Sequence, residues 1–168
     1  MVHRYKDFVP KVHPSVFIAP GAHIIGDVEI GEGCSVWFNS VIRGDVNSIR
    51  IGSGTNIQDG CILHVTHQTH PLNIGNDVTV GHGAVVHGAT LADCCLIGMG
   101  ARVLDGSRVG SHSFVAAGSV VLEGFEIPAG MLVAGVPARI RRSLSQEEQD
   151  QIYQSSRNYR NYAKNYSL

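Results

Sequence analysis

The chain has 168 residues, a formal net charge of −1, and only 16% charged residues, so it shows no basic footprint of a nucleic-acid-binding protein. This length suits one domain, and no apolar run is long enough to span a bilayer. The N-terminal segment MVHRYKDFVPKVHP lacks the apolar stretch of a signal peptide, so we expect a cytoplasmic protein without a membrane or nucleic-acid partner.

A six-residue repeat organises most of the chain. An aliphatic residue recurs every six positions and is usually followed by glycine or another small or polar residue. Such regular self-similarity is typical of a stacked solenoid, in which three six-residue strands make one triangular coil of 18 residues and each coil needs its neighbours to bury its core. The repeat positions, in chain order, are Ile18, Ile24, Ile30, Val36, Ile42, Ile51, Ile57, Leu63, Ile74, Val80, Val86, Leu91, Ile97, Val103, Val109, Val115, Val121, Ile127 and Val133.

Two insertions interrupt this repeat. Three extra residues lie around 46–48, and five lie within 65–73. Because insertions in solenoids usually form loops on one face, we expect these two segments to project beside a binding surface.

The cysteines fit the repeat better than a disulfide or metal site. Cys34, Cys61 and Cys95 each lie four residues after a repeat aliphatic, a position that takes small inward-facing side chains, whereas Cys94 is expected to face outward. The chain contains no CxxC pair.

The repeat is expected to end near Val136, and residues 143–168 read as a helix packed along the solenoid. Ser145 followed by Glu148 is a capping-box signature. The predicted domains are therefore residues 1–142, a solenoid with an N-terminal lead-in, and the C-terminal helix 143–168. The apolar spacing that predicts the packed side of the helix comes from Ile152, Tyr153, Tyr159, Tyr162 and Tyr166.

Three histidines fall at defined positions of the repeat. His64 and His87 each follow a repeat aliphatic by one position, one coil apart on the same face, so they should stack about 4.8 Å apart. Arg43 lies one coil earlier in that column, whereas His82 follows Val80 by two positions, on the preceding face. One chain cannot easily direct all three rings at one ion, but a closed threefold oligomer can, with His64 and His87 from one subunit and His82 from the next. Three unrelated surface histidines are the alternative.

These segments resemble the γ-class carbonic anhydrases among the hexapeptide-repeat proteins. The resemblance rests on IRGD at 42–45, NIQDG at 56–60, LHVTH at 63–67 and VGHGAVVHG at 80–88, and it covers nearly the whole chain. It implies an all-β solenoid, namely a left-handed parallel β-helix with a C-terminal α-helix. It also implies a homotrimer in which His64, His82 and His87 bind zinc, with iron(II) or cobalt(II) as alternatives, and in which a metal-bound hydroxide reversibly hydrates carbon dioxide to bicarbonate at the subunit interfaces.

The resemblance also implies roles for other residues. Arg43 and Asp45 match an ion pair at the subunit boundary, and Asp59 matches a neighbouring acid, all with structural roles. Gln58 matches a residue that orients the metal-bound water or bicarbonate. Tyr159 matches a helix aromatic that lines the pocket.

One departure bears on the rate of the reaction. The best-studied γ enzymes have an acidic loop that shuttles protons, whereas the loop at 65–73 has no carboxylate. His67, in that loop, is the candidate shuttle, although surface histidines are usually idle, and hydration is expected to be weak or even absent. Three alternatives remain: metal-dependent thioester hydrolysis, acyl transfer from coenzyme A with Arg139, Arg141 and Arg142 near its phosphate, and a metal-stabilised trimer without catalysis.

Overall fold

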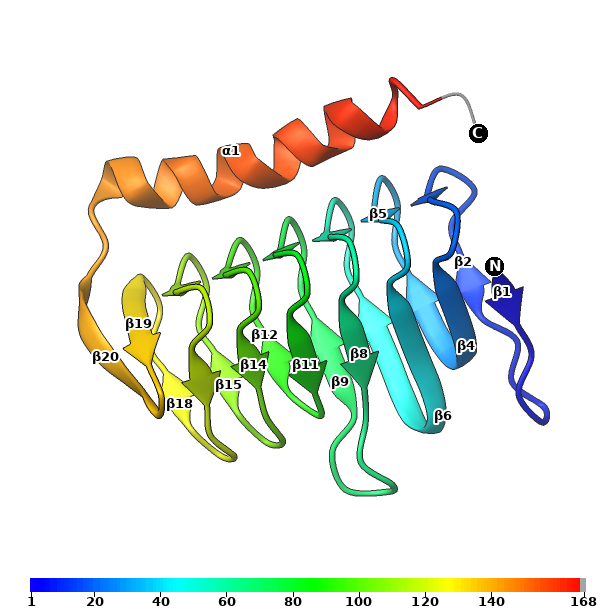
Figure 1. Cartoon of the computed structure of the whole chain (residues 1–168), viewed down its shortest axis with the longest axis horizontal. Coiled ribbons are helices and arrows are strands. Elements are labelled where there is room, and N and C mark those ends of the chain that lie inside the picture. Colours follow the sequence, from blue (N-terminus) through cyan, green and yellow to red (C-terminus); the bar gives the residue numbers. More distant parts are fainter. Residues whose placement is uncertain (167–168) are drawn as a thin grey trace.

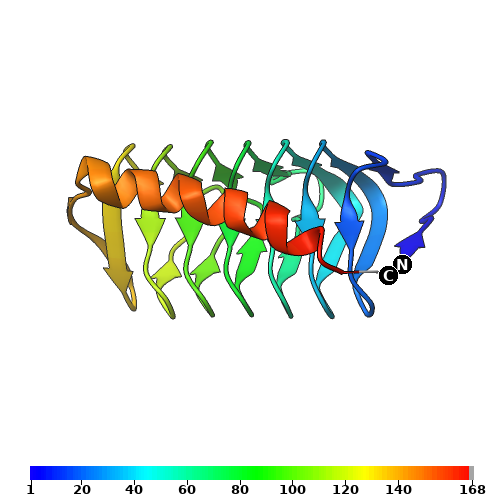
Figure 2. The ribbon, with the colours of Figure 1, turned by 90° about the horizontal axis from the view of Figure 1, so that it is seen from above.

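A computed structural model describes residues 1–166 of the chain, which form a parallel β-solenoid of about seven turns (Figure 1). The coils stack along one axis, and a single helix runs along the length of the stack (Figure 2). The solenoid is the left-handed β-helix that the sequence predicts, with three faces that we number in the order in which the chain crosses them.

The first and second faces share one sheet, because two long strands bend from one face onto the other. These two strands are β4 (His23–Ile30) and β6 (Val41–Ile51). The first face also contains β1 (Val2–His3), β8 (Ile62–His64), β11 (Val85–His87), β14 (Arg102–Val103) and β17 (Val120–Val121). The second face also contains β2 (Lys11–Val12), β9 (Leu72–Ile74), β12 (Thr90–Leu91), β15 (Arg108–Val109) and β18 (Glu126–Ile127).

A separate sheet forms the third face, and all its strands are parallel except the last. Its strands are β3 (Phe17–Ile18), β5 (Ser35–Val36), β7 (Asn56–Ile57), β10 (Thr79–Val80), β13 (Leu96–Ile97), β16 (Phe114–Val115), β19 (Met131–Gly135) and β20 (Ala138–Ser143).

The repeat aliphatics fill the interior of the solenoid, as predicted. All of them are buried except Ile18, which is half-buried at the first coil. Cys34, Cys61 and Cys95 are buried in the same core, and burial raises the pKa of the Cys61 thiol to about 12. These thiols are therefore packing groups rather than reactive ones.

The two insertions lie where the repeat places them. The register between β4 and β6 pairs Gly26 with Gly44 and then Val28 with Ile49, so β6 holds three extra residues at its bend. The second insertion forms a short antiparallel loop between β8 and β9, closed by pairing of Thr66 with His70, and it projects from the solenoid in Figure 1.

The parallel coils end with β19 at Gly135, next to the predicted end of the repeat at Val136. Residues 138–143 form β20, which turns back and pairs antiparallel with β19, so the third face continues to Ser143. The sequence did not reveal this strand because the six-residue repeat ends before it.

The C-terminal helix α1 (Gln146–Ala163) begins later than the predicted Ser143, because Ser143 belongs to β20. Ser145 and Glu148 form the predicted capping box. The helix packs on the third face against β5, β7 and β10. The helix ends at Ala163, so the predicted helix is too long at this end as well, since residues 164–166 are not helical. Residues 167–168 of the predicted helix lie outside the described residues.

The predicted packed side of α1 is only partly correct. Ile152 is buried, but Tyr153 and Tyr162 are 40% and 50% exposed, and Ser156 is buried in their place. Tyr159 and Tyr166 contact Trp37 edge-on, with ring centroids 5.4 Å apart in both cases. Small and aromatic residues therefore fit the helix against the flat third face, which the apolar spacing alone does not specify.

Candidate metal centre

His64 and His87 lie side by side in one column on the first face. The register of β8 and β11 pairs them directly, as the repeat predicts. Their rings are 5.0 Å apart, and His64 Nδ1 lies 3.0 Å from His87 Nε2. The register of β6 and β8 places Arg43 next to His64 in the same column.

A carboxylate binds the other nitrogen of each ring. His64 Nε2 lies 2.9 Å from an oxygen of Asp45, and His87 Nδ1 lies 2.6 Å from an oxygen of Asp105. The second oxygen of Asp105 accepts a hydrogen bond of 2.6 Å from the Thr66 hydroxyl in the loop after β8. Metal-binding histidines commonly have such carboxylate partners, which fix the ring orientation and the tautomer.

Asp105 was missed in the sequence analysis, although the repeat contains the signal. It follows His87 by 18 residues, which is one complete coil, and Leu104 beside it lies in the turn after β14. The side chain of Asp105 therefore reaches the histidine of the preceding coil.

The surroundings of His64 favour the neutral form of its imidazole, the form that binds a metal ion. Burial lowers the pKa of His64 below its usual value, although the hydrogen bond that its ring donates to Asp45 opposes this change. Burial raises the pKa of Asp45, but the hydrogen bonds from His64 and Arg43 outweigh it and leave the net pKa below the usual range. The ion pair between Arg43 and Asp45 thus forms within one chain.

His82 lies at the opposite edge of the first face, in the turn between β10 and β11 rather than on the third face itself. Gly83 supports this turn with a φ of +66°, a conformation that glycine adopts at little cost. His82 Nδ1 lies 2.8 Å from Asp59, and His82 Nε2 lies 3.2 Å from the Tyr159 hydroxyl on α1.

Gln58 holds this turn through its buried amide. Its oxygen accepts a hydrogen bond of 3.2 Å from the His82 backbone N–H, and its nitrogen donates one of 3.1 Å to Asn56. The structure therefore places Gln58, Asp59 and Tyr159 together with His82, and separates them from His64, Asp45 and His87.

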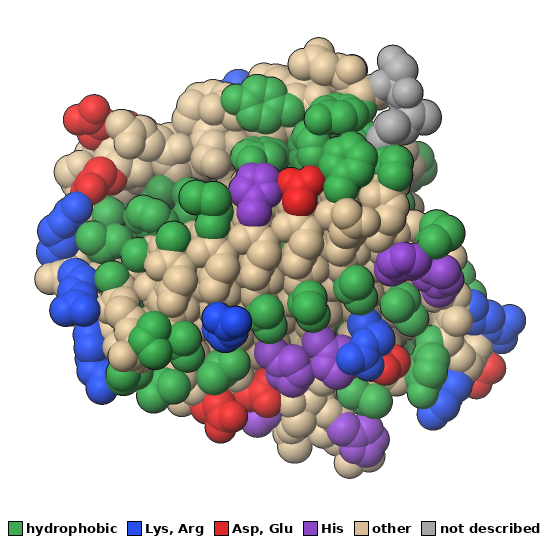
Figure 3. Space-filling model, in the orientation of Figure 1, with side chains coloured by type: hydrophobic (Ala, Val, Ile, Leu, Met, Phe, Trp, Pro, Cys, Tyr) green, Lys and Arg blue, Asp and Glu red, His purple; other side chains and the backbone are tan. Residues whose placement is uncertain are grey.

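Within residues 1–166, no group of three or more histidine, cysteine or acidic side chains is close enough to hold a metal ion. Figure 3 shows separate groups of histidines (purple) on the face that is turned to the viewer; a tan band and a row of hydrophobic side chains (green) lie between the upper and the lower group, and another group lies at the right end. A single chain therefore does not complete the predicted three-histidine set.

The donor groups fit a zinc-type ion. Two nitrogen ligands at 2.0–2.1 Å from a tetrahedral ion lie about 3.3 Å apart, close to the 3.0 Å between the His64 and His87 nitrogens. All three predicted ligands are imidazoles, and each has one ring nitrogen bound to an aspartate.

The remaining predicted residue, His67, is exposed at the tip of the loop after β8. It lines a small hollow together with Asp45, Asn47, Lys6 and Phe8. This position is beside the carboxylate of His64, but the structure records no hydrogen bond from the His67 ring among the described residues.

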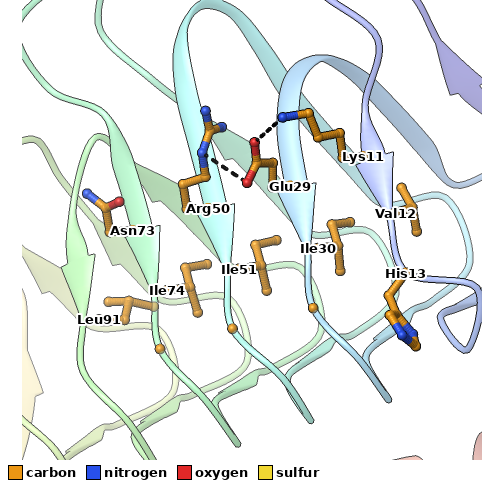
Figure 4. A pocket seen from close by; sticks show the side chains of 13 residues that line it. Lys11, Val12, His13, Glu29, Ile30, Arg50, Ile51, Asn73, Ile74 and Leu91 are labelled. Atoms are coloured by element: carbon orange, nitrogen blue, oxygen red, sulfur yellow. Dashed lines mark hydrogen bonds and ion pairs between the residues drawn. The ribbon is translucent and has the colours of Figure 1, made fainter.

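A wider groove lies elsewhere, on the second face (Figure 4), and includes none of the predicted metal ligands. Lys11, Glu29 and Arg50 form ion pairs along it, above a row of buried aliphatic side chains. In these pairs the cationic side chains of Lys11 and Arg50 both contact the carboxylate of Glu29. Among the described residues, no helix has the length and apolar character needed to cross a membrane.

Comparison with known proteins identifies relatives along nearly the whole chain. The family model for the bacterial transferase hexapeptide (six repeats) matches residues 10–44. The chain is 49% identical over 162 residues to "Gamma carbonic anhydrase 2, mitochondrial" of Arabidopsis thaliana, which covers 94% of this chain and 58% of the plant protein. It is 45% identical over 148 residues to "Probable carbonic anhydrase" of Methanocaldococcus jannaschii, which covers 88% of this chain and 92% of that protein.

A solved structure has the same fold over almost its entire length. The hexapeptide transferase family protein from Anaplasma phagocytophilum superimposes with a TM-score of 0.94 at 38% sequence identity, covering 99% of this chain and 98% of that one. The relatives thus carry two kinds of name, carbonic anhydrase and transferase.

Proposed function

The chain belongs to the γ-class carbonic anhydrase-like family of hexapeptide-repeat proteins, and from this we propose that it is a metal-dependent lyase that reversibly hydrates carbon dioxide to bicarbonate. The observation that carries the proposal is the arrangement of three aspartate-bound histidines at the two edges of one face.

The proposed enzyme is a homotrimer with a metal site at each interface. His64 and His87 of one subunit and His82 of the next would hold the ion, because closed threefold symmetry brings opposite edges of the first face together. Exposed apolar side chains between these edges support this assembly, since Ile62 is 47% exposed and lies beside Val41 and Val85.

Zinc is the expected metal, with iron(II) or cobalt(II) as alternatives, and such an ion supplies Lewis-acid activation of water near neutral pH. Asp45, Asp59 and Asp105 keep the three rings oriented and supply a hydrogen-bond acceptor for the ring nitrogen that does not bind the ion. Arg43 balances the charge of Asp45.

Gln58 and Tyr159 are the proposed residues next to the substrate. The Gln58 amide fixes the His82 turn through its oxygen and retains one N–H that can donate to bicarbonate. The Tyr159 hydroxyl contacts His82 Nε2, so binding of an ion at that nitrogen would release the hydroxyl toward substrate.

His67 is the proposed proton shuttle. Its exposed ring could carry a proton between the hollow beside Asp45 and solvent near neutral pH. A cytoplasmic location also stays a prediction.

The test is carbon dioxide hydration by anaerobically purified protein of known metal content, compared with His87→Ala and with the matched control His13→Ala. The His13 ring is exposed, and its recorded hydrogen bonds among the described residues go to Ser15 alone. We expect metal-dependent hydration in the wild type and the control, and loss of both metal and hydration in His87→Ala. Metal-loaded protein without hydration would refute the proposed reaction.

Acyl transfer and thioester hydrolysis form a second candidate, because the Anaplasma phagocytophilum relative is named a transferase. Arg142 argues against a coenzyme A site at the end of the solenoid, since Glu148 binds it through two hydrogen bonds of 2.7 and 2.8 Å. Turnover of acetyl-coenzyme A by the same metal-loaded protein would favour this candidate, and a trimer inert in both assays would favour the metal-stabilised scaffold.

A further inference from the structure

A third histidine group lies on the first face, away from the proposed interfacial metal site. His3 on β1 and His23 on β4 stack with ring centroids 5.1 Å apart and an interplanar angle of 25°, and His3 Nε2 lies 2.9 Å from His23 Nδ1. Both rings are half-buried, and neither has a carboxylate partner among the described residues.

His23 belongs to the row of side chains that runs along the middle of the first face. The strand register pairs the members of this row one coil after another, and their side chains project outward because their chain neighbours fill the core. The row consists of His23, Val41, Ile62, Val85, Arg102 and Val120. In Figure 3 the hydrophobic part of this face runs toward histidines at the end that carries β1 and β4.

The proposed trimer directs this row at the symmetry axis. If the two edges of the first face contact the two neighbouring subunits, the three copies of that face must enclose the threefold axis. Six residues at about 3.3 Å each give a face roughly 18–20 Å wide, so the middle of each face lies about 5–6 Å from the axis. Side chains of one row position therefore meet their two symmetry copies.

The contact with His3 holds one nitrogen of the His23 ring and leaves the other available to a ligand. It occupies His23 Nδ1, and no hydrogen-bond partner is recorded for His23 Nε2 among the described residues. A metal-binding histidine commonly has one ring nitrogen held by a neighbour and the other open toward the ion. His87 likewise has its Nδ1 bound to Asp105, while its Nε2 faces His64 across the proposed interfacial metal site.

We propose that the three copies of His23 in the trimer bind one divalent transition-metal ion on the threefold axis, with His3 orienting each ring. This axial site rests on the proposed function, because it requires the same trimer. Imidazole ligands favour zinc, nickel and copper over magnesium and calcium.

The experiment measures zinc bound per trimer after equilibration with Zn²⁺ and removal of loosely bound metal, with native mass spectrometry reporting the assembly. The variants are His23→Gln and the control His13→Gln. We expect one ion more than the three interfacial ions in the wild type and the control, and loss of only that ion in His23→Gln with carbon dioxide hydration retained.

Crystals of the unaltered chain provide a second measurement that does not depend on the variant folding. Anomalous scattering at the zinc edge should show a peak on the threefold axis near His23, in addition to peaks near His82. A trimer with the interfacial peaks only, and equal zinc content in His23→Gln, would overturn the axial site while leaving the proposed function intact. A protein that forms no trimer would overturn both.

Discussion

Single residues decide how well the proposed metal site is held. Each candidate ligand has an aspartate partner, but the three pairs differ in exposure: the side chains of His64 and Asp45 are 18% and 15% exposed, whereas those of His82 and Asp59 are 44% and 41% exposed. Asp105 adds a link to the loop through Thr66. The pair beside β8 is therefore the more rigid half of the site, and the His82 half depends on the partner subunit for its environment.

Replacing Asp105 tests the role of these carboxylates. Asp105→Asn removes the charge that orients His87, and outer-shell changes of this kind typically weaken metal binding about 10–100-fold. Competition with a chromophoric chelator measures the affinity, and Glu126→Gln, an exposed change on the second face, is the control. Equal affinities in the two variants would show that Asp105 does not position His87.

Elements of secondary structure follow the repeat as long as the repeat lasts. The six-residue spacing predicts the buried positions, the stacking of His64 on His87, and the place of both insertions. It can do so because, in a solenoid, the number of residues per coil determines which residues of neighbouring coils pair. It cannot predict β20 or the packed side of α1. Those elements lie outside the repeat, and their positions depend on pairing with β19 and on the shape of the third face.

The repeat core carries the stability of the coils. Ile97 is fully buried between neighbouring coils, so Ile97→Ala should lower the free energy of unfolding by about 2–5 kcal/mol through lost burial and a residual cavity. Urea denaturation measures the change, with the exposed Ile140→Ala as control. A loss as small as that of the control would contradict the assignment of Ile97 to the core.

The stability that the first turn of α1 contributes should depend on pH through Glu148. The hydrogen bond from Arg142, with help from the Ser145 backbone, lowers the pKa of Glu148 from 4.5 to about 2. A carboxylate with a lowered pKa stabilises the folded state above its ordinary pKa, and this contribution disappears as the pH falls from about 4.5 toward 2.

The variant Glu148→Gln isolates this effect, because glutamine preserves the capping box but not the ion pair. The difference in unfolding free energy between wild type and variant should be constant above pH 5 and shrink below pH 4.5. Fluorescence of Trp37, which contacts Tyr159 of the helix, reports unfolding. A difference that does not change with pH would rule out the Arg142–Glu148 pair as its source.

At the scale of the whole molecule, the first face carries a stripe of apolar side chains on its surface. Ile62 lies at its centre, between Val41 and Val85, and an ordinary solenoid monomer has no need of this stripe. Three copies would bury it around the axis, and the same arrangement would join the two halves of the metal site. The sequence predicts both halves from residue spacing, but the joining is a property of the assembly and not of one chain.

A charge on this stripe should prevent assembly. Ile62→Glu would place three carboxylates close together at the axis, so we expect a folded monomer without bound metal. Light scattering after gel filtration measures the mass, circular dichroism verifies folding, and the exposed, off-face Ile140→Glu is the control. A trimer that persists in Ile62→Glu would show that the first face is not the interface.

The central claim, that the metal site is divided between subunits, is tested most directly by complementation. His82→Ala and His87→Ala should each lack metal and hydration activity. When equal amounts are unfolded together and reassembled, about a quarter of the interfaces should join intact His64 and His87 of one subunit to intact His82 of the other. We predict recovery of about that fraction of the wild-type metal content and activity, whereas no recovery from mixed trimers would contradict the shared site.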